Sequence, residues 1–134
     1  MTELYKYISS DEELKSLIDN DIFLIEKPEK QIVNGKEKTI NEYIIYKYKE
    51  IGTTSGGYIT QYQVEFDIIG KDINKLITIK NRLIELIDDP RNEKIIKDEN
   101  NTILSSRLAN GGGMVKNSQT GNYSVVVYFV VTKK

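Results

Sequence analysis

The sequence predicts an α+β fold, a mostly antiparallel sheet with an N-terminal helix and one long helix packed on it. Two observations support this prediction. Several stretches alternate apolar and polar residues, as strands with one buried face do, whereas the stretch 73–87 has the periodicity of an amphipathic helix. A chain of 134 residues is long enough for one hydrophobic core and too short for two, so residues 1–134 are expected to form a single domain.

The N-terminal region predicts two short helices. Residues 2–8 can form two helical turns with Leu4 and Ile8 on the same side. A second helix is expected to begin at Ser10, because Ser10 and Glu13 have the spacing at which each side chain satisfies a free backbone N–H of the other residue. The apolar stripe of this second helix consists of Leu14, Leu17 and Ile18.

A short strand and a hairpin are expected next. Residues 22–25 are all apolar and predict a short strand with two apolar faces. In the polar segment that follows, the dipeptide Asn34-Gly35 is a strong signal for a tight turn. We therefore expect a small hairpin that joins 30–33 to 36–40, although a solvated loop fits the same residues equally well.

Two long strands are expected at 43–51 and 58–69, with a turn at 52–57 between them. Along the second strand the apolar positions fall on one side, and they are Tyr58, Tyr62, Val64, Phe66 and Ile68. The other side carries Gln61, Gln63, Glu65 and Asp67. One face of the sheet is therefore expected to pack in the core, and the other to be wet or to contact something polar.

The stretch 73–87 predicts the longest helix, with Asp72 as its N-cap. The apolar side chains of this helix cover about half of its circumference, which is wide for a helix that lies on one sheet. Two explanations fit: a deep groove inside its own domain, or one packing partner inside the subunit and a second outside it. Lys80 lies within the apolar arc, where it either extends its ammonium group to water or pairs across an interface.

The C-terminal third predicts two strands, 103–108 and 123–131. Between them we expect a flexible loop at Asn110-Gly111-Gly112-Gly113, a continuation of the ladder at 114–116 and a turn at 117–122. The strand 123–131 is apolar on both faces. It is therefore expected to be central in the sheet, or to be covered by a neighbouring subunit.

The composition argues against catalysis. The chain has no cysteine and no histidine, so it lacks the commonest general base, cysteine nucleophiles and thiolate metal ligands. The acidic pairs Asp88-Asp89 and Asp98-Glu99 lie in polar segments and are explained by helix capping and solvation. The stretch Gly111–Lys116 lacks the spacing of a phosphate-binding loop. We expect a protein that is not an enzyme and that binds no cofactor and no metal.

Charge and hydropathy restrict the partners and the location. The 19 basic and 20 acidic residues give a net charge of −1, so no field of one sign attracts nucleic acid. No apolar run approaches the ~20 residues that span a bilayer, and residues 1–20 do not resemble a signal peptide. We expect a chain made in the cytoplasm, with neither a membrane nor a specific nucleic-acid sequence as partner. The nine tyrosines fit sheet packing or a protein interface.

Several segments, in a fixed order, resemble a known family. They are Tyr7-Ile8-x-x-Asp11-x-x-Leu14-x-x-Leu17-Ile18, Asp21-Ile22-Phe23, Pro28-Glu29, Tyr43-Ile44-Ile45-Tyr46, Tyr62-Gln63-Val64-Glu65-Phe66-Asp67-Ile68 with Gly70-Lys71, and the helix Leu76 to Ile87. Together with the final apolar strand, this pattern resembles the tail-terminator (tail-completion or minor tail) proteins of long-tailed phages and related contractile particles. The likeness covers residues 4–90 well, and the C-terminal third only in outline.

The resemblance implies a subunit that assembles with itself into a ring, a hexamer, on the last ring of a tail tube. Such a ring stops the polymerisation of the tail tube protein and offers a surface to a head or neck connector protein. The chain would then belong to a virion or phage-tail-like particle assembled in the host cytoplasm. The alternatives are a head–tail connector or minor capsid component, a small enzyme that uses carboxylates or lysine, and a non-phage protein-binding domain.

The expected assembly surface combines the wide helix with strand tyrosines and glycine-containing turns. Its residues are Ile77, Lys80, Ile84, Tyr46, Tyr48, Asn34, Gly35, Gly111, Gly112 and Gly113. The helix 73–87 and the strand 123–131 are expected to supply the packing. The two glycine-containing turns are expected to become ordered on assembly.

Overall fold

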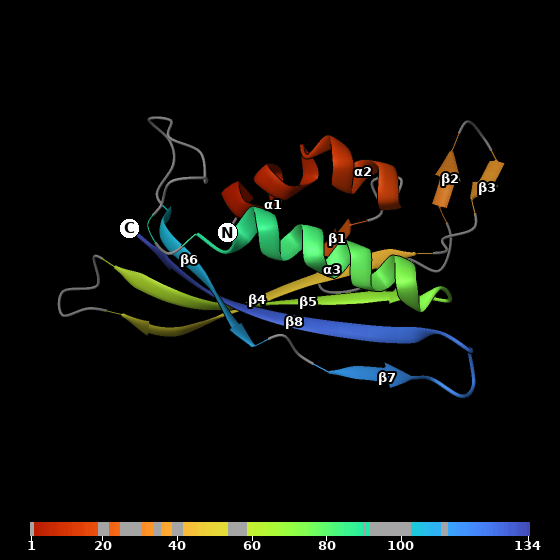
Figure 1. The fold of residues 1–134 in the computed structure, drawn as a ribbon. Coiled ribbons are helices and arrows are strands. Elements are labelled where there is room, and N and C mark those ends of the chain that lie inside the picture. The colour runs from red at the N-terminus through yellow and green to blue at the C-terminus, as the bar shows by residue number, and fades with distance from the viewer. Residues whose placement is uncertain are drawn as a thin grey trace.

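The computed structural model describes residues 2–18, 22–24, 31–33, 36–38, 42–53, 59–89, 91, 103–110 and 113–134. In this part of the chain, three helices lie over one face of a six-stranded sheet, and a separate two-stranded hairpin stands beside them (Figure 1). The α+β prediction is confirmed. The helices and the sheet enclose one hydrophobic core between them.

Helices α1 (Thr2–Ser9) and α2 (Glu12–Ile18) follow one another directly. The expected start of α2 at Ser10 is wrong, because Ser10 still belongs to the last turn of α1, where its backbone N–H bonds to the carbonyl of Lys6 at 3.1 Å. The cap of α2 is instead Asp11, whose carboxylate accepts the backbone N–H of Leu14 at 2.9 Å. The buried residues of the two helices are Leu4, Ile8, Leu14 and Ile18.

Helix α3 (Ile73–Ile87) has the bounds that its periodicity predicts. Its N-cap is Asp72, whose Oδ1 accepts the backbone N–H groups of Asn74 at 3.1 Å and Lys75 at 3.4 Å. The helix buries one side against the sheet and is joined to α1 on another, where the Tyr7 hydroxyl donates to the Leu86 carbonyl at 3.2 Å. Its own domain therefore covers most of the wide apolar arc. The fully buried side chains of α3 are Leu76, Ile79, Leu83 and Ile87.

The main sheet is built around three long antiparallel strands, β4 (Tyr43–Thr53), β5 (Thr60–Gly70) and β8 (Tyr123–Lys133). Strands β6 (Ile103–Asn110) and β7 (Met114–Lys116) both pair with β8 on its other side. The strand order β1-β4-β5-β8-β6 makes β8 a central strand, which is one of the two explanations that its two apolar faces allowed.

Three features of the strands differ from expectation or extend it. Strand β1 (Ile22–Leu24) forms, but it runs parallel to β4, so the sheet is antiparallel except at this edge. Strand β4 continues through Gly52, which was expected to lie in a turn, with a register shift between Glu50 and Gly52 that absorbs the extra residue. The predicted hairpin is present as β2 (Gln31–Val33) and β3 (Lys36–Lys38), which pair with each other in a sheet of their own.

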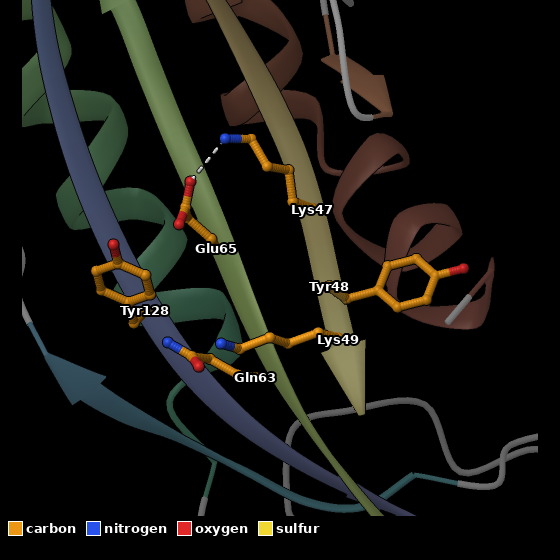
Figure 2. A pocket seen from close by; sticks show the side chains of 6 residues that line it. All are labelled: Lys47, Tyr48, Lys49, Gln63, Glu65 and Tyr128. Carbon is orange, nitrogen blue, oxygen red and sulfur yellow. Dashed lines mark ion pairs between the residues drawn. The ribbon is translucent and has the colours of Figure 1, made fainter. Parts of the chain in front are cut away.

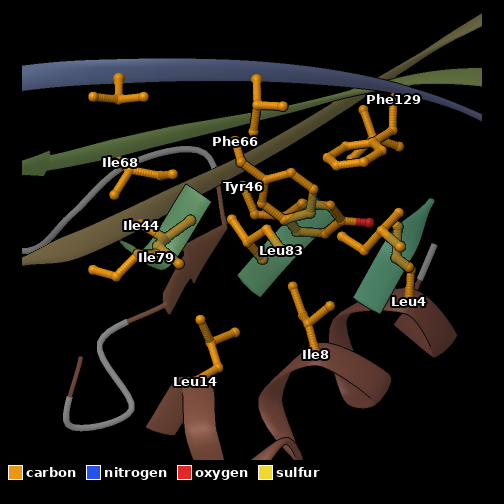
Figure 3. Packing of buried hydrophobic residues seen from close by; sticks show 14 of the residues in the cluster. Leu4, Ile8, Leu14, Ile44, Tyr46, Phe66, Ile68, Ile79, Leu83 and Phe129 are labelled. Carbon is orange, nitrogen blue, oxygen red and sulfur yellow. The ribbon is translucent and has the colours of Figure 1, made fainter. Parts of the chain in front are cut away.

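The core forms because alternate residues of the long strands face the helices. Phe66 lies against Tyr46 with ring centroids 5.3 Å apart, and against Phe129 at 5.8 Å. Figure 3 shows these rings between the sheet and the side chains of the helices, including Leu4, Ile8 and Leu83. The predicted alternation along β5 is confirmed, because Val64, Phe66 and Ile68 are buried.

Candidate assembly surfaces

Ile77, Lys80 and Ile84 lie together on one flank of α3, because their spacing of three and four residues places them on the same side of a helix. The opposite flank carries Arg82 and Leu86, which contact the N-terminal helices. Ile77 is 37% exposed, while Lys80 and Ile84 are half-buried. The structure therefore brings the three predicted helix residues into one strip beside the core, and Ile77 is its most accessible apolar side chain.

The two predicted tyrosines have different environments. Tyr46 is only 1% exposed and stacks on Phe66 and on Tyr5, so it belongs to the core of its own subunit and cannot contact a neighbour from there. The assignment of Tyr46 to an assembly surface is therefore wrong. Tyr48 is 44% exposed and packs edge-to-face on Tyr62, with centroids 6.0 Å apart. Tyr48 is accessible to a partner, and its role at an interface stays a prediction.

The predicted turn residues are only partly described by the structure. Asn34, Gly35, Gly111 and Gly112 lie outside the described residues. Gly113 is exposed, and its carbonyl accepts the backbone N–H of Val126 at 3.1 Å, which holds it beside strand β8. The proposed ordering of the two glycine-containing turns on assembly stays a prediction.

The face of the sheet opposite the helices, here called the outer face, is a second candidate surface. None of the described helices covers it (Figure 1). A shallow hollow of about 350 Å³ lies on this face across β4, β5 and β8. Figure 2 shows Lys49 reaching across β5 toward Gln63, with Tyr128 beyond it. The side chains of the outer face that line the hollow are Lys47, Lys49, Gln63, Glu65 and Tyr128. Tyr48 borders the hollow at β4, but its ring points away from the other five (Figure 2).

A charged cluster lies at one end of the hollow. The ammonium group of Lys47 lies 3.0 Å from Glu65 Oε2 and 2.9 Å from Asp67 Oδ2, and these hydrogen bonds raise the pKa of Lys47. Burial raises the pKa of Asp67, and the hydrogen bond from Asp67 lowers the pKa of Glu65. The Oδ1 atom of Asp67 is buried and has no hydrogen-bond partner among the described residues. Two carboxyl groups thus share one lysine on a half-buried surface.

Two further cations lie on one row of residues across the outer face. Lys49 pairs in register with Gln63, Gln63 with Val130, and Val130 with Arg107. Residues that lie directly opposite each other on paired strands project from the same face of a sheet, so all four side chains lie on the outer face. Lys49 and Arg107 are both exposed, and neither has an ion partner among the described residues. We call Lys49 and Arg107 the cationic row.

The helical layer carries a surface of the opposite sign, where α2 begins beside α3. Arg82 donates to Asp11 through Nε at 3.0 Å and through Nη2 at 2.7 Å. Its Nη1 also lies 3.2 Å from Glu13 and 3.3 Å from Glu85. Glu12 pairs only loosely, at 3.7 Å, with Lys15. Four carboxylates therefore lie beside only two cations, Arg82 and Lys15. We call this surface the acidic corner, and its carboxylates are those of Asp11, Glu12, Glu13 and Glu85.

Among the described residues, no three side chains of His, Cys, Asp or Glu gather closely enough to hold a metal ion. No described helix is both long and apolar enough to cross a membrane. The candidate surfaces offer charge, hydrogen bonds and apolar area to another macromolecule.

The sequence analysis did not predict either charged surface, although the sequence indicates part of the one on the outer face. The alternation along β5 placed Gln63, Glu65 and Asp67 on a polar side. The pairing of Lys47 with Glu65 depends on the register of β4 against β5, and the contact of Arg82 with Asp11 depends on how α3 packs on α2. Neither contact has a local sequence signature.

The fold has a close counterpart among solved structures. It is similar to a chain in the structure of the virion of a native gene transfer agent (GTA) particle, with a TM-score of 0.72 over 97% of this chain and 90% of that chain. The two sequences are 6% identical. No family model and no curated protein matches the sequence. The similarity establishes a shared fold over nearly the whole of both chains.

Proposed function

We propose that this chain is a structural subunit of a phage-like particle and that it forms a closed ring, a hexamer, at the end of a tail tube. In that place the ring ends the polymerisation of the tube protein and joins the tube to a head or neck connector protein. The observation that carries the proposal is the fold, which a chain of a gene transfer agent virion shares from end to end. The order of sequence segments independently resembles tail terminators.

The surfaces of the subunit support a ring. A ring arises when one surface of each copy binds a different surface of the next copy and the rotation closes. This chain presents two unlike surfaces on opposite sides, the helical layer with its exposed Ile77 and the open outer face with its hollow. The proposal assigns the chain no enzymatic activity, because its chemistry is that of a binding surface without histidine or cysteine. Assembly would take place in the host cytoplasm.

Electron microscopy of the chain with its tube protein tests the proposal. The protein is expressed with and without its cognate tube protein, and both preparations are imaged in negative stain. Six-fold rings, or tubes that are shorter and capped at one end, are the expected result. Tubes of unchanged length without a cap, together with no ring at high protein concentration, would overturn the terminator function and favour a connector or an unrelated binding protein.

A further inference from the structure

The cationic row and the hollow beside it form a surface suited to carboxylates. Lys49 has no ion partner among the described residues, and its ammonium group extends over the hollow toward Gln63 (Figure 2). The Gln63 amide is a further donor, and Arg107 lies on the same row two strands away. Lys47 is not available in the same way, because its ammonium group already pairs with the carboxylates of Glu65 and Asp67. The unpaired positive charge of this face is therefore that of Lys49 and Arg107.

The acidic corner presents the complementary charge on the other side of the same molecule. Glu12 is 90% exposed, and Glu13 and Glu85 are also mostly exposed. Arg82 is largely buried beneath them, is bound by Asp11 through two hydrogen bonds and also pairs with Glu13 and Glu85 through Nη1. The corner stays negative because its four carboxylates outnumber its two cations, Arg82 and Lys15.

We propose that the acidic corner of one copy of this chain binds the cationic row of a second copy, with Glu12 and Glu13 facing Lys49 and Arg107. The occupant is a second copy because the two surfaces belong to one chain, are opposite in charge and lie on opposite sides of it. This front-to-back contact uses unlike surfaces, so each copy leaves one of each kind free for the next neighbour, as ring closure requires. The inference names the subunit contact of the proposed ring and rests on that function.

Charge reversal provides the first test. Lys49→Glu places like charges against each other and is expected to weaken self-association by about tenfold or more, as Glu12→Lys does from the other side. The chain that carries both changes restores opposite charges at every contact and is expected to recover most of the association. Sedimentation velocity measures all four proteins, and the matched control is Lys71→Glu, which alters an exposed lysine away from both surfaces.

The dependence on salt gives an independent readout of the same contact. Charge pairs at an exposed contact are screened, since the Debye length falls from about 10 Å at 0.1 M salt to about 3 Å at 1 M. Self-association of the wild-type chain is therefore expected to weaken as salt is added. Association that strengthens with salt, or single and double reversals with the same effect, would overturn the inference.

Disulfide trapping tests the contact even if the chain is monomeric in the absence of the tail tube. The natural sequence has no cysteine, so two single-cysteine variants, Glu12→Cys and Lys49→Cys, can be mixed at high concentration under mild oxidation. We expect more Glu12→Cys/Lys49→Cys heterodimer than with the control pair Gln119→Cys/Lys49→Cys, in which Gln119 lies in the exposed turn after β7. Equal yields from the two pairs would refute the contact.

The outcomes for the contact and for the ring function can be told apart. Six-fold rings that form equally well from Lys49→Glu would leave the ring function standing and refute this contact. Specific trapping without rings or capped tubes would support the contact and refute the terminator function.

Discussion

Arg82 is the residue that ties α3 to the N-terminal helices. It makes two hydrogen bonds to the Asp11 carboxylate, and the two side chains are only 19% and 15% exposed. Arg82→Ala leaves this carboxylate partly desolvated and short of its main partner. We therefore expect the free energy of unfolding to fall by about 2 kcal/mol, measured by urea denaturation. Arg82→Lys keeps the charge but loses the two-pronged geometry, so its loss should be smaller.

Arg107→Ala is the matched control for this prediction. Arg107 is exposed on the outer face and has no ion partner among the described residues, so its removal should change stability by less than about 0.5 kcal/mol. Equal losses for Arg82→Ala and Arg107→Ala would contradict a stabilising role for Arg82. The hydrogen bond from Arg82 also holds the pKa of Asp11 below 3.8. This part of the stability is therefore present above about pH 4 and is lost as pH falls through the folded-state pKa.

Asp67 predicts the opposite dependence on pH. Its carboxyl is partly buried on the outer face, where Lys47 faces it from β4, Glu65 lies beside it on β5 and Tyr128 lies on β8, and burial raises its pKa above 3.8. At pH values between 3.8 and the raised pKa of the folded state, Asp67 binds more protons in the folded state than in the unfolded state. The contribution of Asp67 to stability should therefore fall as pH rises through that interval.

The Asp67→Asn variant measures this contribution. An amide resembles the protonated carboxyl, so the stability of the variant should not decrease as pH rises through this interval. Its urea midpoint should therefore be higher than that of the wild type at pH 7. Below pH 3.8 the two midpoints should converge, because Asp67 is then protonated in both states. Glu12→Gln, at a mostly exposed position, serves as control and should follow the wild-type profile. A lower midpoint of Asp67→Asn at pH 7 would show that the ion pair with Lys47 outweighs the cost of burial.

At the residue scale, sequence predicts which side a residue faces better than it predicts how deeply the residue is buried. Tyr46 and Tyr48 are two positions apart on β4 and face the same side, yet one is in the core and the other is accessible. The difference is that Tyr5 of α1 packs on Tyr46. That contact joins residues far apart in the chain, so no local pattern could place the boundary of the core between the two tyrosines.

At the element scale, the N-cap of α3 is directly testable. Asp72 accepts two backbone N–H groups from the first turn, at 3.1 and 3.4 Å. Asp72→Ala removes the Oδ1 atom that accepts both hydrogen bonds and is expected to lower the free energy of unfolding by about 1 kcal/mol, whereas Asp72→Ser should retain most of the stability. Thermal or urea denaturation measures the difference. Lys71→Ala, one residue earlier and exposed, should have little effect, and an equal loss there would contradict the capping role.

Elements with strong local signals were predicted well, and those that depend on distant contacts were not. The bounds of α3 follow from its periodicity and its cap, and the β2–β3 hairpin is one of the two structures that the segment around Asn34-Gly35 allowed. The start of α2 was misplaced because Ser10, directly after α1, donates its backbone N–H to the Lys6 carbonyl of that helix. Asp88-Asp89 was expected only to end a helix, but Asp89 also exchanges two backbone hydrogen bonds with Ser106 of β6. That bridge requires β6 to lie beside the end of α3, which residues 88–89 alone do not specify.

At the scale of the whole molecule, the layers were predictable and the order of strands was not. The polar side of β5 and the arc of α3 together predict helices on one face of a sheet. The parallel pairing of β1 with β4, and the place of β8 between β5 and β6, are long-range choices. The two apolar faces of β8 were consistent with a central position, but they allowed a subunit contact equally well. Only the structure separates these explanations.

The β2–β3 hairpin allows a last prediction about how folding and assembly are divided within the chain. The main sheet contains neither of its strands. Replacing residues 31–38 by a short Gly-Ser linker should therefore leave the domain folded, with a change in the free energy of unfolding of less than about 1 kcal/mol, because changes in loop length cost little. If the hairpin is an arm toward a neighbouring subunit, the same variant should lose rings and tube capping. Circular dichroism with urea denaturation measures the fold, and negative-stain microscopy measures the assembly. An unfolded variant would show that the hairpin belongs to the domain, and intact rings would exclude it as an assembly arm.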